Sequence, residues 1–332
     1  MSDRPGAATA AHPRPRWPTT SHVERDYWQR RIGELDPDVD FWEIYRIMVA
    51  HEFPWDMTQS LGLALYRTYA VPSIGELLAA TGEFPTHTHK RYADTGLILD
   101  AVLEHGFASQ TGRAAIRRMN QMHGAYAISN DDMRYVQSTF VVVPIRWLDR
   151  FGWRPLTEAE RRASANYYRE LGRHMNIKDS PATHQEFAAY LDAYERERFA
   201  YSEGGRAVSD ATLALLIGFQ PRPLRPLVRR LTLALLDPPL RDAFGYPDPR
   251  RLMGAVAVAG LRARALVERR LPPRREPRFV RELPEFAIYP EGYTVDRLGT
   301  YPGVAPASAP RKAGIIGTSQ SRRTGTPDPG DP

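Results

Sequence analysis

The sequence predicts an all-α protein, on three observations. Apolar residues recur with a period of about 3.6 residues through several long stretches. Helix-capping patterns precede some of these stretches, and the alternation of short strands and turns that a sheet fold requires is missing from the sequence. With 332 residues, 42% of them hydrophobic, the chain is long enough for a large core in one domain or at most two.

Both ends of the chain differ in composition from the part between them. Residues 1–20 are rich in Pro, Ala and Thr and contain no continuous apolar run, so they resemble neither a secretory signal nor a membrane anchor. Residues 301–332 are dense in Gly, Pro, Ser and Thr. We therefore expect a disordered N-terminal arm (1–20), a helical domain (21–300) and a disordered C-terminal tail (301–332).

No stretch is apolar for long enough to span a bilayer. The longest largely apolar run, residues 252–261, has ten residues, whereas a spanning helix needs about 20. We expect a cytoplasmic protein that can at most lie on a membrane surface. The chain has no cysteine, which excludes disulfides, iron–sulfur clusters, zinc fingers and a thiolate-bound haem.

The first informative helix contains Arg91 and Thr95, one turn apart. Helical spacing aligns both with the apolar Ile98, Leu99 and Val102, so a guanidinium and a hydroxyl are carried toward the core. A buried arginine needs a partner, because an uncompensated charge is costly in an apolar interior. A haem propionate or an aspartate would satisfy it, since guanidinium binds carboxylates with two parallel hydrogen bonds. Pairing with a neighbouring helix explains the pattern equally well.

The next helix, over residues 111–126, places His123 on its apolar face. The other residues on that face follow the same spacing: Ala115, Ile116, Met119, Met122 and Tyr126. A histidine in this position is either a metal ligand or a core residue hydrogen-bonded to a carbonyl. Without cysteine, a haem has to be held by His, Tyr or Met, and a haem pocket is the simplest reading of Arg91, Thr95 and His123 together.

A further helix follows Ser129. Asp131 and Asp132 fall in its first turn, where acidic groups complement the helix dipole. Capping explains them without a pocket role, although a pocket role stays open. The β-branched residues 141–143 lie within a long periodic segment, which favours helix over strand. Pro144 should kink or interrupt this helix.

Two later helix starts carry explicit signals. Thr157 and Glu160 form a capping box that opens a helix running to about residue 175. The following helix begins either at Ser180–Pro181 or at Thr183, with Glu186 three residues later, and ends near Tyr201.

Positive charge is concentrated in residues 220–281. This segment has 15 arginines, no lysine and five acidic residues, so it carries +10, while the whole chain carries +6. Arginines interleaved with Leu and Ala are typical of amphipathic helices that rest on an anionic membrane. The alternatives are a solvated outer face or pairing with acidic groups elsewhere in the chain. A nucleic-acid partner is not expected, because no recognition module accompanies the charge.

Several segments resemble a known family. They are 90–95 (KRYADT), 118–132 (RMNQMHGAYAISNDD), 138–141 (STFV), 144–148 (PIRWL), 152–157 (GWRPLT) and 193–199 (AYERERF). In this order and spacing they resemble the family that contains the rubber oxygenase (latex clearing protein) and the MpaB oxygenase, over roughly residues 40–300.

The resemblance implies an all-α, globin-like bundle around a haem b pocket. It implies that His123 is the proximal iron ligand, that Arg91 and Thr95 line the pocket, and that O2 cleaves a carbon–carbon double bond in an isoprenoid-like, lipophilic substrate. The rubber enzymes carry a lysine where this chain has Asp94, which argues against a rubber-like substrate. Their pocket glutamate has two candidate positions here, Glu76 and Glu83.

Three functions are therefore expected in order. The first is a haem-dependent oxygenase with Arg91 and Thr95 as catalytic groups and His123 on the iron. The second is a haem-binding sensor or carrier in which Asp94 marks lost catalysis. The third is a haem-free helical protein that binds a membrane or a partner through residues 220–281.

Overall fold

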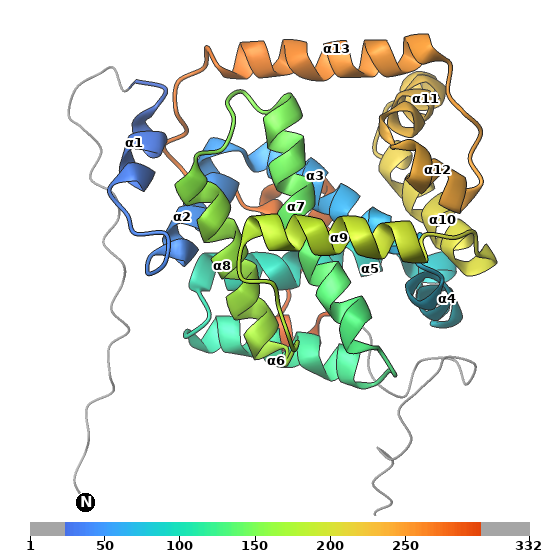
Figure 1. The fold of residues 1–332 in the computed structure, drawn as a ribbon, viewed down its shortest axis with the longest axis horizontal. Helices are drawn as coiled ribbons and strands as arrows, with labels where there is room; N and C mark the ends of the chain where they lie inside the picture. The colour runs from blue at the N-terminus through green and yellow to red at the C-terminus, as the bar shows by residue number, and fades with distance from the viewer. Residues whose placement is uncertain (1–23, 300–332) are drawn as a thin grey trace, which may run out of the picture.

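The computed structural model describes residues 24–299, without the side chains of residues 83–86, and this part of the chain is built from helices (Figure 1). Residues 24–299 form thirteen α-helices and no strand, which confirms the predicted all-α class. The two arms expected to be disordered, 1–20 and 301–332, lie outside the described residues. The single domain over 21–300 stays a prediction.

The α-helices follow one another with short connections. They are α1 (Tyr27–Gly33), α2 (Phe41–Ile47), α3 (Pro54–Thr68), α4 (Pro72–Ala80), α5 (Glu83–His105), α6 (Gln110–Gly124), α7 (Asn130–Phe151), α8 (Glu158–His174), α9 (His184–Arg198), α10 (Glu203–Gly218), α11 (Arg225–Leu235), α12 (Pro238–Phe244) and α13 (Arg251–Glu268). A π-helical turn, η1 (Met48–Glu52), joins α2 to α3. Short 3₁₀ turns are η2 (Arg222–Leu224), η3 (Val280–Glu282), η4 (Pro284–Phe286) and η5 (Val295–Arg297).

Helix α7 lies at the centre of the bundle. It packs against α3, α8 and α9, and α9 crosses in front of it in Figure 1. Helix α5 packs against α6 on one side and α10 on the other, while α11 and α13 pack on each other at one edge of the molecule. The segment after α13 returns to α5 and α6 through η3, η4 and η5.

The expected helix starts are largely confirmed. Thr157 and Glu160 form both hydrogen bonds of a capping box at the start of α8. Ser129 caps α7, and α9 starts after Thr183, so the second of the two expected starts is correct. Helix α7 continues through Pro144, so the interruption expected there does not occur.

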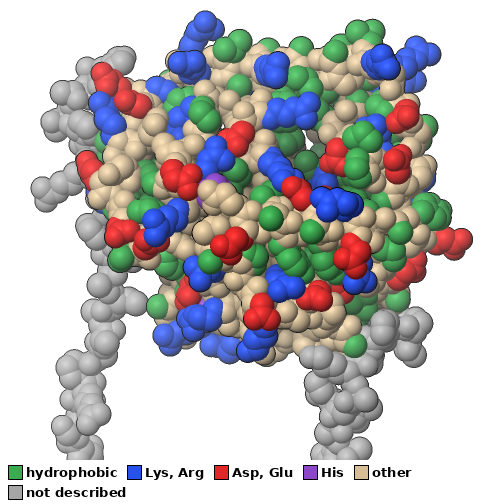
Figure 2. Space-filling view, viewed as in Figure 1, with side chains coloured by type: hydrophobic (Ala, Val, Ile, Leu, Met, Phe, Trp, Pro, Cys, Tyr) green, Lys and Arg blue, Asp and Glu red, His purple; other side chains and the backbone are tan. Residues whose placement is uncertain are grey.

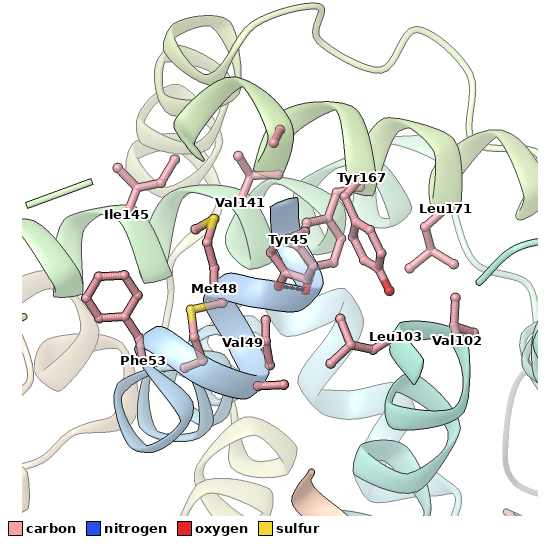
Figure 3. Packing of buried hydrophobic residues seen from close by; sticks show 14 of the residues in the cluster. Tyr45, Met48, Val49, Phe53, Val102, Leu103, Val141, Ile145, Tyr167 and Leu171 are labelled. Carbon is pink, nitrogen blue, oxygen red and sulfur yellow. Dashed lines mark hydrogen bonds between the residues drawn. The ribbon is translucent and has the colours of Figure 1, made fainter. Parts of the chain in front are cut away.

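The core has one large and one smaller hydrophobic cluster. The large one is centred on α2, η1, α5, α7 and α8; Figure 3 shows Tyr45, Met48 and Val49 facing Val141 and Ile145 of α7. The smaller one joins α3 to α10, α11 and α12. Close packing of this kind makes any internal space that remains a specific feature of the fold.

Helix α4 is held against α10 by a glycine contact. A Cβ on Gly75 would lie 2.6 Å from the Cα of Gly205 and 2.6 Å from the carbonyl oxygen of Tyr69. These are backbone atoms that cannot rotate away, so the two helices can approach this closely only without a side chain at position 75.

Substituting Gly75 with alanine should separate α4 from α10. We expect Gly75→Ala to lower the free energy of unfolding by about 1–3 kcal/mol, the usual cost of overpacking, measured by urea titration. Gly33→Ala is the matched control, because a Cβ there meets nothing within 4 Å. Equal stabilities for the two variants would contradict the close approach.

Candidate functional site

A cavity of about 460 Å³ lies inside the bundle, enclosed by α3, α4, α5, α6, α7 and α8. We call it the central cavity. Its size falls within the range of pockets that bind cofactors and small molecules. Leu, Ile, Met, Val and Phe side chains form most of its wall, and Arg91, Thr95 and His123 all contribute to it. The three site residues predicted from the sequence therefore meet at one cavity.

His123 is positioned by its own helix. Its Nδ1 lies 2.9 Å from the carbonyl oxygen of Met119, one turn earlier in α6. A carbonyl only accepts, so Nδ1 carries the proton and donates, and Nε2 is left as the ring nitrogen with a free electron pair. Burial lowers the pKa of His123, the Met119 carbonyl opposes this, and the nearby positive charge of Arg91 lowers it further. The imidazole is therefore neutral at pH 7, as a metal ligand must be.

Arg91 and Thr95 are joined to each other across one turn of α5. The Arg91 Nη1 donates to the Thr95 hydroxyl at 2.6 Å, and that hydroxyl donates to the Arg91 carbonyl at 2.9 Å. The pair fixes a positive charge and a hydroxyl on the cavity wall. The expected inward direction of this helix face is correct: Ile98 and Leu99 line the same cavity, and Val102 is buried in the core.

Asp132 has both of the roles that the sequence left open for it. Its backbone N–H donates to the capping hydroxyl of Ser129 at 3.0 Å. Its carboxylate lines the central cavity and accepts hydrogen bonds from Ser73 (2.9 Å), Ser129 (2.8 Å) and Tyr194 (2.8 Å). Asp131 is exposed and pairs with Arg134. No sequence signal pointed to Ser73 or Tyr194, because both come from other helices.

Asp94 does not line the central cavity, although it precedes Thr95. It is buried on another face of α5, where it accepts from Lys90, from the Tyr289 hydroxyl and, at 2.7 Å, from the backbone N–H of Gly299. Asp94 thus anchors residues 289–299 on α5. Arg118 of α6 assists by donating to the Leu298 carbonyl at 2.6 Å.

The two glutamates considered for the pocket are placed differently. Glu76 accepts from the backbone N–H of Gly204 at 2.9 Å, at the start of α10, and does not line the central cavity. The side chain of Glu83 lies outside the described part. Across residues 24–299, apart from the side chains of 83–86, no three or more His, Asp or Glu side chains group as they would around a metal ion.

Fold and site together define a class: an all-α protein that holds a neutral histidine, an arginine and a threonine around an apolar cavity suited to a prosthetic group. Residues 49–265 match the family described as ER-bound oxygenase mpaB/B'/Rubber oxygenase, catalytic domain, and the chain belongs to this family. The family predicted from the sequence segments is confirmed.

Three fungal relatives show the extent of the similarity. The chain is 29% identical over 256 residues to ER-bound oxygenase mpaB' of Penicillium brevicompactum, covering 72% of this chain and 60% of that protein. It is 27% identical to ER-bound oxygenase mpaB of Penicillium roqueforti (64% and 77%) and 28% identical to mpaB of P. brevicompactum (64% and 61%). The match thus spans about 60% of the length of the two P. brevicompactum proteins.

The anchoring role of Asp94 can be tested by truncating its side chain. We expect Asp94→Ala to lower the free energy of unfolding by about 2 kcal/mol, because three donors lose a charged acceptor, and to speed tryptic cleavage at Arg297. The matched control is Asp131→Ala, which removes an exposed ion pair and should cost less than about 1 kcal/mol. A variant as stable and protease-resistant as the control would contradict the anchor.

Proposed function

We propose that this protein is a haem b-dependent oxygenase that uses O2 on a lipophilic substrate. The observation that carries the proposal is His123: a neutral imidazole on the wall of an apolar cavity, with Nδ1 held by a carbonyl and Nε2 left for iron. Membership in a family of oxygenase catalytic domains supports the same activity.

The residues around the central cavity fit a haem. His123 would hold the iron through Nε2, and the Met119 carbonyl would fix the ring orientation, as hydrogen bonds behind metal-binding histidines commonly do. Arg91 supplies a guanidinium suited to a propionate carboxylate, and the aliphatic wall suits the porphyrin face. When bound, the haem supplies the oxygen chemistry that amino-acid side chains lack.

The chain's own groups then define the reaction environment. The apolar wall excludes water and favours a hydrocarbon over a polar substrate. Arg91 and Thr95 present the positive charge and the hydroxyl on that wall, so we assign them the polar contacts to the reacting oxygen atoms. The reaction we propose is oxidative cleavage of a carbon–carbon double bond in an isoprenoid-like chain.

The position of Asp94 bears on the sensor or carrier alternative. That alternative took Asp94 as a sign of lost catalysis, but the carboxylate anchors residues 289–299 and does not line the central cavity. The difference from the rubber enzymes therefore gives no reason to expect an inactive site.

Replacing His123 tests the proposal directly. We expect the wild type, expressed with haem precursor, to show a Soret band that shifts with dithionite and carbon monoxide. His123→Ala should lose at least about 90% of the bound haem, because iron loses its protein ligand. The control is His105→Ala, which alters a half-exposed histidine at the end of α5. A colourless wild type, or full haem in His123→Ala, would refute the assignment. Haem without O2 consumption on any acyclic isoprenoid would favour a carrier.

A second proposal concerns α11 and α13. Their outer faces expose Leu227, Leu252, Leu266 and Val267, and Figure 2 shows Arg and hydrophobic side chains interspersed along the edge that α13 forms. We propose that this face rests on an anionic membrane, as basic amphipathic helices do. The relatives are named ER-bound. Across residues 24–299, no helix has the combined length and apolar character needed to cross a bilayer.

Part of the basic segment is instead used inside the protein. Arg264 pairs with the buried Asp56, and Arg281 contacts both Asp100, at 3.0 Å, and Glu104, at 2.6 Å. The expectation of pairing with acidic groups therefore also holds for these arginines.

Membrane binding should depend on the exposed apolar residues of α13. We expect the double variant Leu266→Ser/Val267→Ser to bind phosphatidylserine-containing vesicles at least five-fold more weakly in a flotation assay, since less apolar area is buried. Binding of the wild type should weaken with salt, because screening reduces the attraction of arginine to anionic lipid. Val39→Ser, at an exposed valine before α2, is the control. Unchanged binding of the double variant would exclude this face.

A further inference from the structure

The central cavity has two hollow neighbours. A side cavity of about 90 Å³ shares Thr95, Leu99 and Phe140 with it. An outer cleft of about 340 Å³, between α3, α10, α11 and the segment after α13, shares Thr58, Tyr92 and Phe286 with the side cavity. The three hollows therefore follow one another, each separated from the next by a wall of side chains that both touch.

The side cavity is apolar. Aliphatic side chains such as Leu61, Leu103 and Val280 and the rings of Tyr45 and Tyr167 form it. Asp100 is the charged group in its wall, and Arg281 neutralises this carboxylate at 3.0 Å. Such a space has no polar partner to offer a charged or strongly hydrated ligand, whereas it accommodates hydrocarbon without a desolvation cost.

Phe286 separates the side cavity from the outer cleft. Its ring lies against Gly96 of α5, where a Cβ would come within 2.2 Å of the ring, and packs 5.3 Å from the ring of Tyr92. The ring is carried by η4, a single 3₁₀ turn, and not by one of the long helices. A side chain on such a turn can move without unfolding a helix.

We propose that the side cavity binds the acyclic hydrocarbon chain of the substrate, which enters from the outer cleft past Phe286 and reaches the central cavity beside Thr95. This inference rests on the proposed oxygenase function and narrows its substrate class: an extended chain fits the succession of hollows, and a compact ring system does not. Phe286 is then a specificity-determining residue.

Gly62 offers a way to fill the side cavity. It lies on α3 in the cavity wall, and a Cβ there meets only the Tyr92 hydroxyl, at 3.9 Å. Gly62→Leu therefore places an isobutyl group in the space without an initial clash. Gly33→Leu is the matched control, since nothing lies within 4 Å of a Cβ on that exposed helical position.

Binding of cis-parinaric acid, a linear polyene whose fluorescence changes on burial, provides the readout for the protein as purified. We expect Gly62→Leu to weaken binding at least ten-fold and Gly33→Leu to leave it unchanged within two-fold. Gly62→Ala, which adds one methyl group to the same space, should weaken binding less, in the same direction. Linear 1-dodecanol should displace the probe, and compact 1-adamantanol should not.

The entry route is tested by stopped-flow measurement. Phe286→Ala should accelerate association of the probe at least three-fold, because the side chain between cleft and side cavity is removed. Unchanged affinity in both Gly62 variants, or equal displacement by the two alcohols, would overturn the proposal. The haem absorption of the same samples reports on the oxygenase proposal separately, so a colourless protein that binds the chain and a haem protein that does not are distinct results.

Discussion

The hydrogen bond from His123 to the Met119 carbonyl is the interaction on which the candidate site depends. It holds the imidazole at the cavity wall, fixes its tautomer and satisfies one polar group without a water or a second helix. Thr95 follows the same local rule, since its hydroxyl donates to a carbonyl of its own helix. Because these polar groups are paired within single turns, the rest of the wall can stay apolar.

The inward direction of the site residues could be predicted because it follows from helical period alone. Arg91, Thr95 and His123 share a face with apolar neighbours, and one face of each helix must be buried. Capping chemistry predicted the start of α8 for a similarly local reason. The sequence segments that resemble the oxygenase family then identified which of these buried polar residues belong together.

Contacts between distant segments were beyond sequence reasoning. Asp94 was compared with a catalytic lysine because it precedes Thr95, but its partners Tyr289 and Gly299 lie 195 and 205 residues away. Arg264 counted as surface charge, whereas it pairs with Asp56, 208 residues away. Pro144 stays inside α7, within a densely packed part of the core where tertiary contacts stabilise the helix despite the lost N–H. Local pattern gives no information about any of these outcomes.

The contact between Gly96 and Phe286 links two positions 190 residues apart. A methyl group at 96 is incompatible with the ring in its present place, and a smaller residue at 286 would remove that restriction. The two positions should therefore co-vary in evolution: homologues with a larger residue at 96 are expected to lack an aromatic one at 286. Such paired changes would mark branches of the family whose substrates differ in shape.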